Sequence, residues 1–349
     1  MKRKVITTTG YYATGSSAIY DLLKEYRTCT EGKVGQADVE HLMLYTPNGL
    51  FDLEDKLLIG NSIHRSDEAL RSFYTEMRRI NDNNFVWFGN YKKILGPRFM
   101  EATEEMIENL TDIKLDCKWS YDYLYTKFSL RHVLGSLRNK LLNRPVVGDF
   151  SRGIVFREKD CTRYSYATPE EFYSEARKFV DTYFDLITGD NEGDLILDHF
   201  ILPNNLFRMK NYFDDNLKVF LVERDPRDVY IGRMRAEKKL KVKSRVPSDI
   251  DDFITFWKKL RNTVKEADNP NIMFIRFEDL IYKYDETVKK VEEFCGYTAE
   301  DHVEPKKYFK PEVSIKNTQS FLVDTEWSKE IKKIEEALPE YLYDFPTEK

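Results

Sequence analysis

The 349-residue sequence has little cysteine and no apolar stretch long enough to span a membrane or to form a signal peptide. Its four cysteines form no CxxC pair and lie far apart, at Cys29, Cys117, Cys161 and Cys295. This spacing excludes a zinc-finger pattern and a disulfide framework, and it is typical of proteins in a reducing cytosol. We therefore expect a soluble cytoplasmic protein with no metal site.

A strong charge of either sign is also lacking, since the net charge is −5 and the pI is about 5.8. This balance argues against a nucleic-acid partner. One segment, Arg233 to Arg245, is locally basic, with seven Lys or Arg residues and one acidic residue. We interpret it as a solvated helix face and loop. The alternative is a basic rim that attracts an anionic cofactor or acceptor.

Four short apolar runs predict buried strands of a parallel sheet, at Val5–Thr8, Leu195–Leu197, Val219–Val222 and Ile272–Ile275. Only the first run precedes a long, aromatic-rich and mostly helical segment, residues 28–193. We expect an α/β fold in which helices flank a parallel sheet. Residues 1–349 would form a single domain, with 28–193 as an insertion that builds the acceptor site. A separate helical domain is the alternative.

Two helices carry clear boundary signals. Thr168, Pro169 and Glu171 supply an N-cap, a proline at the first helical position and a capping-box glutamate, and this helix should end near Gly189. The second helix should run from Leu280 to Cys295 and stop at Gly296.

The stretch VITTTGYYATGSSAIYDLL, residues 5–23, has the outline of a phosphate-binding loop. A strand leads into Gly10, four residues, Gly15 and a helix, but serines stand where a Walker A loop has Lys and then Ser or Thr. Backbone amides and the hydroxyls of Thr14, Ser16 and Ser17 could hold an anion. Without the lysine, the loop lacks the positive charge that pairs with the β- and γ-phosphates of a triphosphate, so a less charged group fits better. An ordinary strand–turn–helix is the alternative.

A second anion site is indicated by KVFLVERDPRDVYIGRMR, residues 218–235. The strand should end at Val222, and Asp225 and Pro226 have the pattern of an N-cap and a first helical residue. Arg224 lies between the end of this strand and the N-cap, where its planar guanidinium could bind a phosphate through two hydrogen bonds. The alternative is a surface turn with structural Arg–Asp pairs.

Together these stretches resemble the sulfotransferases that use 3′-phosphoadenosine 5′-phosphosulfate (PAPS), and bacterial members in particular. The resemblance covers about residues 5–26 and 194–325. It implies that PAPS binds without a metal and that Arg224 holds the 3′-phosphate. It also implies that the C-terminal stretch PEVSIKNTQSF closes over the nucleotide as a loop, through Ser314, Lys316 and Asn317. The phosphosulfate would lie on the first loop, at Ala13, Thr14, Gly15, Ser16, Ser17 and Ala18.

The sequence departs from the family pattern at two positions. Ala13 stands where many members have a Lys or Arg, and Gly232 stands where the family has a serine that contacts the 3′-phosphate. The cation missing at Ala13 must come from elsewhere, and the candidates are Lys4, Arg65 and Lys118.

The stretch LILDHFILP places Asp198 and His199 at the end of a predicted strand. The family resemblance implies that His199 is the general base, because an acceptor hydroxyl must lose its proton during transfer. Asp198 is the alternative base. Strand alternation predicts that the two side chains point to opposite faces.

The predicted function is transfer of a sulfuryl group from PAPS to an acceptor hydroxyl of a carbohydrate or glycolipid. A sterol or another small hydroxylated metabolite is an alternative acceptor. A lysine-deficient kinase of the P-loop fold would need ATP and magnesium. A non-catalytic protein would bind the 3′,5′-bisphosphate product and transfer nothing.

Overall fold

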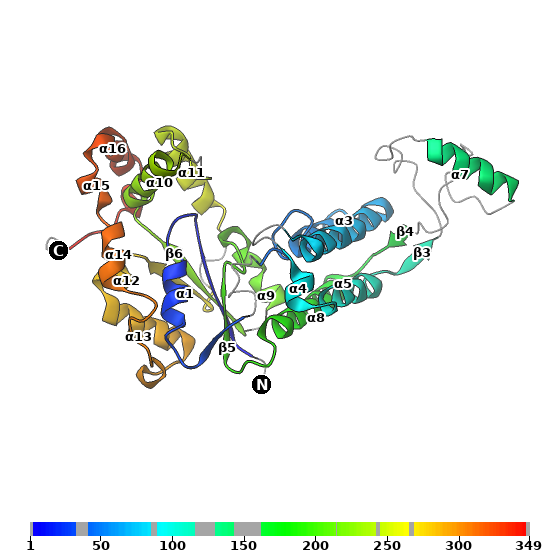
Figure 1. Cartoon of the computed structure of the whole chain (residues 1–349), viewed down its shortest axis with the longest axis horizontal. Coiled ribbons are helices and arrows are strands. Elements are labelled where there is room, and N and C mark those ends of the chain that lie inside the picture. The colour runs from blue at the N-terminus through cyan, green and yellow to red at the C-terminus, as the bar shows by residue number, and fades with distance from the viewer. Residues whose placement is uncertain are drawn as a thin grey trace. The chain divides into compact units, whose positions relative to one another are not determined.

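The computed structural model describes residues 3–32, 41–84, 89–115, 130–142, 162–213, 215–241, 245–264 and 269–346 (Figure 1). The chain folds as two compact units. The first comprises Met1–Leu42, Asn84–Phe88 and Phe184–Lys349, and the second comprises Met43–Asn83 and Gly89–Tyr183. The second unit falls within the segment 28–193 that the sequence singles out. That this segment is an insertion forming the acceptor site stays a prediction.

The first unit contains a five-stranded parallel sheet with the strand order β2-β5-β1-β6-β7. The four apolar runs predicted from the sequence are strands, so the predicted α/β fold is confirmed. The strand that the sequence did not reveal is β2, a three-residue edge strand without an apolar run. The strands are β1 (Val5–Gly10), β2 (Cys29–Glu31), β5 (Asp194–Asp198), β6 (Leu217–Glu223) and β7 (Ile272–Arg276).

Helices α1 (Ser17–Leu23) and α13 (Tyr284–Cys295) pack with the sheet into one hydrophobic core. Leu22 of α1 and Val291 of α13 are fully buried in the same cluster as Phe220 of β6. Burial of such side chains is the main stabilising term for a sheet and its covering helices. This packing fixes α1, and therefore the loop before it, against the strands.

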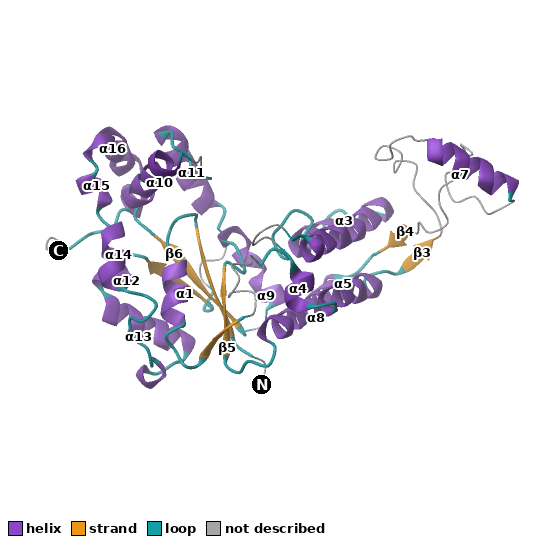
Figure 2. Ribbon diagram, viewed as in Figure 1, coloured by secondary structure: helices purple, strands orange, loops and turns teal. Residues whose placement is uncertain are grey.

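A second core of the first unit joins helices α10 (Pro226–Leu240), α11 (Ile250–Asn262) and α16 (Ser328–Ala337), drawn as a group in Figure 2. Tyr230, Trp257 and Ile334 are buried in it. Asp225 caps α10 as predicted, since its side chain accepts a hydrogen bond from the backbone amide of Arg227. The start of α10 is therefore fixed immediately after β6.

Two expectations for the C-terminal third need correction. The helix predicted from Leu280 to Cys295 is interrupted at Lys283, which separates α12 (Asp279–Tyr282) from α13. The segment predicted as a loop near Ser314 is helical, with α14 (Pro311–Ser314) followed by the 3₁₀ turn η4 (Ile315–Asn317). Pro311 explains the difference, because proline is favoured at the first position of a helix.

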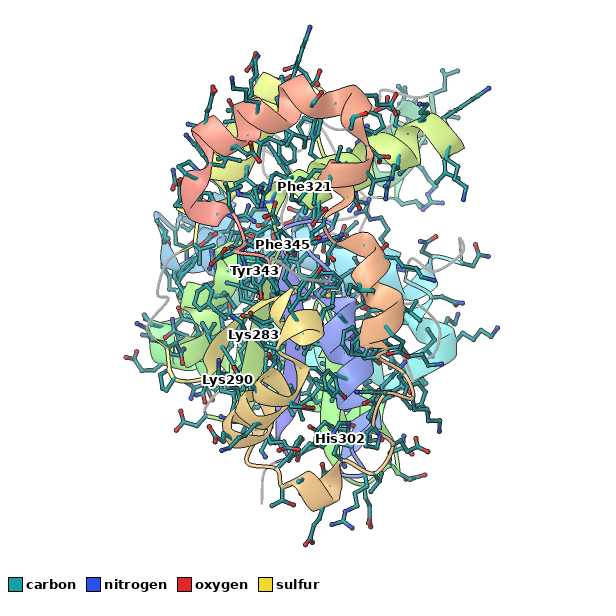
Figure 3. All side chains as sticks on the ribbon, turned by 90° about the vertical axis from the view of Figure 1, so that its left-hand side faces the viewer. Lys283, Lys290, His302, Phe321, Tyr343 and Phe345 are labelled. Atoms are coloured by element: carbon teal, nitrogen blue, oxygen red, sulfur yellow. The ribbon has the colours of Figure 1, made fainter. Side chains whose placement is uncertain are left out.

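The chain after η4 continues through short helical pieces. These are α15 (Ser320–Val323), η5 (Thr325–Trp327), α16 and η6 (Pro339–Tyr341). Aromatic side chains connect their ends, since the rings of Phe321 and Tyr343 lie 5.9 and 5.0 Å from the ring of Phe345 (Figure 3). These contacts hold the last residues of the described chain against α15.

The second unit is mostly helical. An aromatic core of Phe73, Tyr91, Phe99 and Phe179 is buried between its helices. Helix α8 has the predicted capping box at Thr168 and Glu171 and ends just before Gly189. The unit also contains an antiparallel pair that the sequence did not indicate, β3 (Ile113–Leu115) and β4 (Thr162–Tyr164). The helices are α2 (Leu50–Leu58), α3 (Ile63–Asp82), α4 (Tyr91–Leu95), α5 (Arg98–Asn109), α7 (Leu130–Leu141) and α8 (Pro169–Thr188), whose end belongs to the first unit.

Candidate functional site

The segments that follow β1, β5, β6 and β7 meet at the carboxyl edge of the sheet. Thr8 of β1 lies opposite Asp198 of β5, and Gly10 lies opposite Val222 of β6. In the strand order β2-β5-β1-β6-β7, the strands β2 and β5 lie on one side of β1 and the later strands β6 and β7 lie on the other. This reversal of direction makes the edge at β1 a topological switch point. Such points are where open α/β sheets bind ligands.

The loop after β1 is tightly wound. Tyr12 and Ala13 both have a left-handed backbone, with φ of 53° and 58°, and the hydroxyl of Thr14 accepts a 3.1 Å hydrogen bond from the amide of Tyr11. A Cβ on Gly10 would lie 2.2 Å from the Thr14 hydroxyl oxygen, so this position needs glycine. Gly15 has φ of +85° and has the Phe277 ring beside it. The hydroxyl of Thr14 therefore shapes the loop.

Arg224 connects three segments of this edge. Its Nη1 donates a 3.3 Å hydrogen bond to the carbonyl of Ala13, and its Nη2 donates a 2.5 Å hydrogen bond to the carbonyl of Asn317. The guanidinium also lies 4.7 Å from the centre of the Phe277 ring. Burial lowers the pKa of Arg224, and the carboxylates of Asp228 and Glu278 oppose this effect. An arginine remains cationic in such a setting.

A cavity of about 330 Å³ opens beside these contacts. Among the residues predicted for the cofactor site, the structure brings five together in its wall: Gly15, Ala18, Arg224, Ser314 and Asn317. They come from three parts of the chain that are far apart in sequence. The remaining wall residues are Asp21, Phe277, Tyr308, Phe309, Lys310 and Val313.

The other predicted cofactor residues do not line this cavity. Ser17 is exposed, and Ser16 is buried with its hydroxyl directed to His199. Lys316 is exposed on η4, and Gly232 is exposed on α10 with open space where a side chain would be. A contact of Gly232 or Lys316 with a nucleotide stays a prediction.

The structure also bears on the missing loop cation. Lys4 lies at the amino end of β1, away from the loop, where it binds the carbonyl of Cys295 and pairs with Asp194 at 3.2 Å. Lys4 is therefore not the replacement. Arg65 belongs to the second unit and binds the carbonyl of Gly60 within it, and Lys118 lies outside the described residues.

Lys310, which the sequence analysis missed, lines the cavity itself. Its ammonium group makes no hydrogen bond or ion pair with the described part of the chain. It precedes Pro311 at the start of α14, but no sequence pattern distinguishes it from the many other lysines.

His199 joins two other predicted residues through its imidazole ring. Its Nδ1 lies 2.9 Å from Oδ1 of Asp198, and its Nε2 lies 3.1 Å from the hydroxyl oxygen of Ser16. The hydroxyl of Thr8 also donates to Asp198, at 2.5 Å. The expectation that Asp198 and His199 point to opposite faces is wrong. His199 has a left-handed backbone, with φ of 53°, which turns its ring back toward Asp198.

The charge on Asp198 follows from these contacts. Burial favours the neutral carboxyl, but hydrogen bonds from His199 and Thr8 outweigh it, so the pKa of Asp198 lies below its usual range. An ionised carboxylate only accepts hydrogen bonds, so Nδ1 of His199 carries the proton that is shared with Asp198. A neutral imidazole then has its lone pair on Nε2, which accepts from Ser16.

A neighbouring histidine has no such role. His41 is buried, and burial lowers its pKa to about 4, so its ring is neutral at physiological pH. Its ring packs edge-on against Phe200, with the ring centres 5.8 Å apart.

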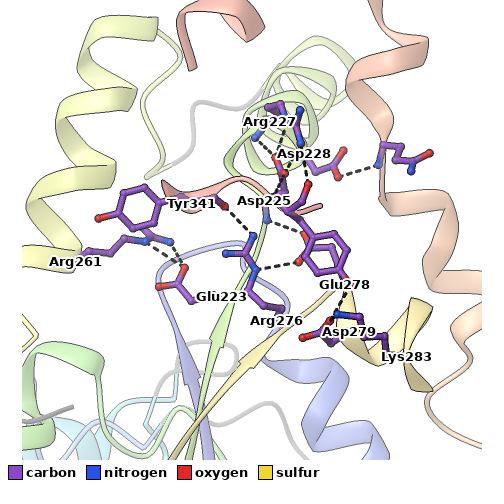
Figure 4. A network of polar contacts seen from close by, with 12 residues as sticks. Glu223, Asp225, Arg227, Asp228, Arg261, Arg276, Glu278, Asp279, Lys283 and Tyr341 are labelled. Carbon is purple, nitrogen blue, oxygen red and sulfur yellow. Dashed lines mark hydrogen bonds and ion pairs between the residues drawn. The ribbon is translucent and has the colours of Figure 1, made fainter. Parts of the chain in front are cut away.

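A network of buried carboxylates holds the segment Arg224–Asp228 in place (Figure 4). Glu278 accepts a 2.7 Å hydrogen bond from the amide of Asp225, and Asp225 pairs with Arg227. Burial raises the pKa of Asp228 to about 6 and that of Glu278 to about 7. Asp225, Asp228 and Glu278 thus form a group of buried acids close enough to act on the charge of Arg224.

The part of the cavity wall formed by Tyr308 and Phe309 depends on Glu25, which is fully buried after α1. Its Oε1 accepts hydrogen bonds from the amides of Tyr308 and Phe309, at 3.0 and 2.9 Å. Its Oε2 accepts from the amide of Lys306 and contacts Nε2 of His302 at 2.8 Å. One carboxylate therefore organises the segment that ends in the cavity wall.

The family model described as "Sulfotransferase domain" matches residues 199–336. This span includes His199, Arg224 and the C-terminal segment, whereas the loop after β1 lies outside it. Residues 199–336 are therefore similar to a sulfotransferase domain, and the resemblance to sulfotransferases predicted from the sequence is confirmed. No curated protein matches the chain.

Several solved structures are similar to this chain at low levels of identity. The sulfotransferase domain from the curacin biosynthetic pathway has 11% identity and a TM-score of 0.39, and the match covers 99% of each chain. The sulfotransferase domain from the Synechococcus PCC 7002 olefin synthase has 11% identity and a TM-score of 0.37, covering 99% of this chain and 98% of that one.

Retinol dehydratase, in a complex with androsterone and the inactive cofactor PAP, has 13% identity and a TM-score of 0.34. The match covers 99% of this chain and 84% of that one. Values this low carry no argument about the substrates of this chain. In the part of the chain that the structure describes, no helix is long and apolar enough to cross a membrane.

Proposed function

We propose that this chain transfers a sulfuryl group from PAPS to a hydroxyl of a carbohydrate or glycolipid. The observation that carries the proposal is the cavity in which Gly15 and Ala18 meet Arg224, Ser314 and Asn317. The sequence predicts these residues for one nucleotide site from three separate stretches. The structure brings these residues together, and Arg224, Ser314 and Asn317 lie within the span that matches a sulfotransferase domain. Both observations support PAPS as the donor.

The donor would bind through charge and hydrogen bonds without a metal. Arg224 would hold the 3′-phosphate through its guanidinium, and the amides between Thr14 and Ala18 would hold the phosphosulfate. Lys310 supplies the cation that the loop lacks at Ala13. The cavity volume, about 330 Å³, lies within the range of small-molecule sites. Among the described residues, no acidic, histidine and cysteine cluster could hold a metal ion.

His199 would act as the general base. The Nδ1–H bond to Asp198 puts the lone pair on Nε2, where an acceptor hydroxyl would take the place of the Ser16 hydroxyl, and the side chain is 39% exposed. As the acceptor oxygen bonds to sulfur, its proton passes to Nε2 and the bridging oxygen leaves with its electron pair on the bisphosphate. The ionised Asp198 would stabilise the imidazolium that forms. Its depressed pKa makes Asp198 itself a poor base.

We assign the acceptor site to residues 28–193 because of their aromatic content, which suits a sugar ring as well as a sterol or another small metabolite. Two alternative functions, a kinase and a non-catalytic binding protein, can be distinguished from sulfuryl transfer by simple measurements. A P-loop kinase variant would turn over ATP with magnesium, and a non-catalytic protein would bind the bisphosphate without any transfer.

We also propose a cytoplasmic location, because Cys29 and Cys295 are free thiols.

The first test is titration calorimetry with 3′,5′-bisphosphoadenosine in the absence of metal. We expect binding, and we expect Arg224→Ala to weaken it by about 2–3 kcal/mol through loss of a charge-assisted contact. Arg98→Ala is the matched control, since the side chain of Arg98 is 43% exposed in the second unit and pairs with Glu105. Equal affinity of Arg224→Ala and the wild type would remove Arg224 from the site.

The second test follows transfer itself. The protein is incubated with labelled PAPS and a panel of glycans, glycolipids, sterols and phenols, and products are identified by mass spectrometry. Sulfation of a glycan or glycolipid supports the proposal, and sulfation of a sterol or phenol alone corrects the acceptor. Bisphosphate binding with no product from any acceptor, and ATP turnover with magnesium, would each contradict it.

A further inference from the structure

We propose that helix α7 (Leu130–Leu141) is an amphipathic element that lies on the surface of an anionic lipid bilayer. The helix presents a row of uncovered leucines. Leu130 and Leu141 are 78% and 85% exposed, and Leu134 and Leu137 between them are 64% and 53% exposed. Single exposed apolar residues are ordinary, but a contiguous apolar row marks an interaction surface.

The leucines form one stripe along the helix. Positions 130, 134, 137 and 141 are separated by four, three and four residues, which is the spacing of a single helix face. Helix α5 of the same unit has a stripe of the same kind, but Phe99, Met106 and Ile107 in it are buried. The stripe of α7 is therefore complete in sequence, and its leucines are exposed in the part of the chain that the structure describes.

The charges of α7 indicate what covers this stripe. Residues 130–142 contain three basic residues and no acidic residue. Arg138 and Lys140 are exposed, and a rotation of about 100° per residue puts them about 80° to either side of the leucine stripe. Long basic side chains at the two edges of an apolar face can reach lipid phosphates while the leucines enter the acyl region.

The same charges disfavour a second copy of this chain as the occupant. Two α7 helices packed through their leucines would bring basic edges together without an acidic residue in either helix to pair with them. An anionic bilayer has the complementary charge. The helix has 12 residues and is about 18 Å long, too short to span a bilayer, so it would lie in the surface.

This inference goes beyond the proposed function and agrees with it, because surface binding would bring the enzyme to lipid-linked acceptors. The two can fail separately. Vesicle binding is measured without PAPS or acceptor, whereas sulfation can be measured with a soluble glycan in the absence of lipid.

The test is co-sedimentation of the full chain with vesicles of phosphatidylcholine alone or mixed with phosphatidylglycerol. We expect binding to the anionic vesicles that weakens as salt is added. Arg138→Gln with Lys140→Gln should weaken this binding by about 30-fold, and Leu134→Glu with Leu137→Glu should abolish it. The matched control is Lys258→Gln with Lys259→Gln, which removes two exposed lysines from α11.

Three results would overturn the proposal. The first is no binding, or equal binding to both kinds of vesicle. The second is unchanged binding by the leucine variant when circular dichroism shows it to be folded. The third is a concentration-dependent dimer in analytical ultracentrifugation that the leucine variant abolishes, because the stripe would then belong to a second copy.

Discussion

The carboxylate of Asp228 in α10 accepts a 2.9 Å hydrogen bond from the backbone amide of Gln319, 91 residues further along the chain. Its other oxygen accepts a 2.7 Å hydrogen bond from the amide of Ser320. The helix that follows Arg224 therefore holds the segment that follows Asn317. Two walls of the cavity are coupled through one buried side chain.

We predict that Asp228→Asn loosens the C-terminal segment. An amide side chain would direct N–H groups at one of the two backbone amides, which loses a hydrogen bond and leaves a buried donor unpaired. Amide hydrogen exchange should become faster in residues 311–323, and bisphosphate affinity should fall by about 10-fold. Asp251→Asn, which alters an exposed pair with Lys333, is the control. Unchanged exchange in Asp228→Asn would show that the segment is held by other contacts.

Stability should depend on pH through Glu278. Burial raises its pKa to about 7, so the folded state holds a proton that the unfolded chain releases at lower pH. The unfolded chain therefore binds fewer protons between about pH 4.5 and 7, and this group lowers the free energy of unfolding as pH rises through that window. His41 acts in the opposite direction between about pH 4 and 6.5, since burial lowers its pKa.

The variant Glu278→Gln isolates this contribution, because a glutamine oxygen can still accept from the amide of Asp225. Urea denaturation at several pH values should show a difference between wild type and variant that changes by on the order of 2 kcal/mol from pH 5 to 8. The variant should gain relative stability as pH rises. A constant difference across this range would mean that Glu278 titrates alike in both states.

The roles of His199 and Asp198 can be separated by kinetics. We expect His199→Ala to lower kcat by roughly 100-fold and to leave bisphosphate affinity nearly unchanged. Asp198→Asn should retain more activity and move the acidic limb of the pH–rate profile to lower pH, because the imidazolium loses its carboxylate partner. If only Asp198→Asn abolishes turnover while His199→Ala is near wild type, then Asp198 is the base.

Glu25 should matter for both stability and ligand binding. Glu25→Ala leaves the amides of Lys306, Tyr308 and Phe309 without their acceptor, and the free energy of unfolding should fall by more than about 2 kcal/mol. Bisphosphate affinity should fall as well, because Tyr308 and Phe309 line the cavity. Glu25→Gln keeps one oxygen and should be intermediate. Glu300→Ala, at an exposed position, is the control, and equal melting temperatures for the two alanine variants would contradict the assignment.

Much of the sheet and its edge could be predicted because the signals are local. The strand at Val219 is a continuous apolar run, and the strand at Val5 combines two apolar residues with β-branched threonines. Gly10, Gly15 and Pro226 stand at or after the ends of these strands, and their backbone preferences are known. The same information places Arg224 after a strand and before a helix. Such short-range rules predict which residues reach the carboxyl edge of a parallel sheet.

The features that were missed depend on contacts distant in sequence or on unusual backbone. Strand β2 is only Cys-Thr-Glu and pairs with a strand more than 150 residues later. The buried carboxylate of Glu25 binds amides that follow it by 281 to 284 residues. His199 departs from strand alternation through a positive φ that no residue type requires here. None of these has a pattern in the nearby sequence.

The hydrogen bond between Ser16 and His199 occupies the lone pair on Nε2 that an acceptor hydroxyl would need. While the serine of the loop donates to Nε2, that nitrogen cannot take a proton from a water molecule or an alcohol. A phosphosulfate on the loop would attract the same hydroxyl and release the nitrogen. The base would then become available only when the donor is in place, and a bound donor without an acceptor would be the state most exposed to wasteful hydrolysis.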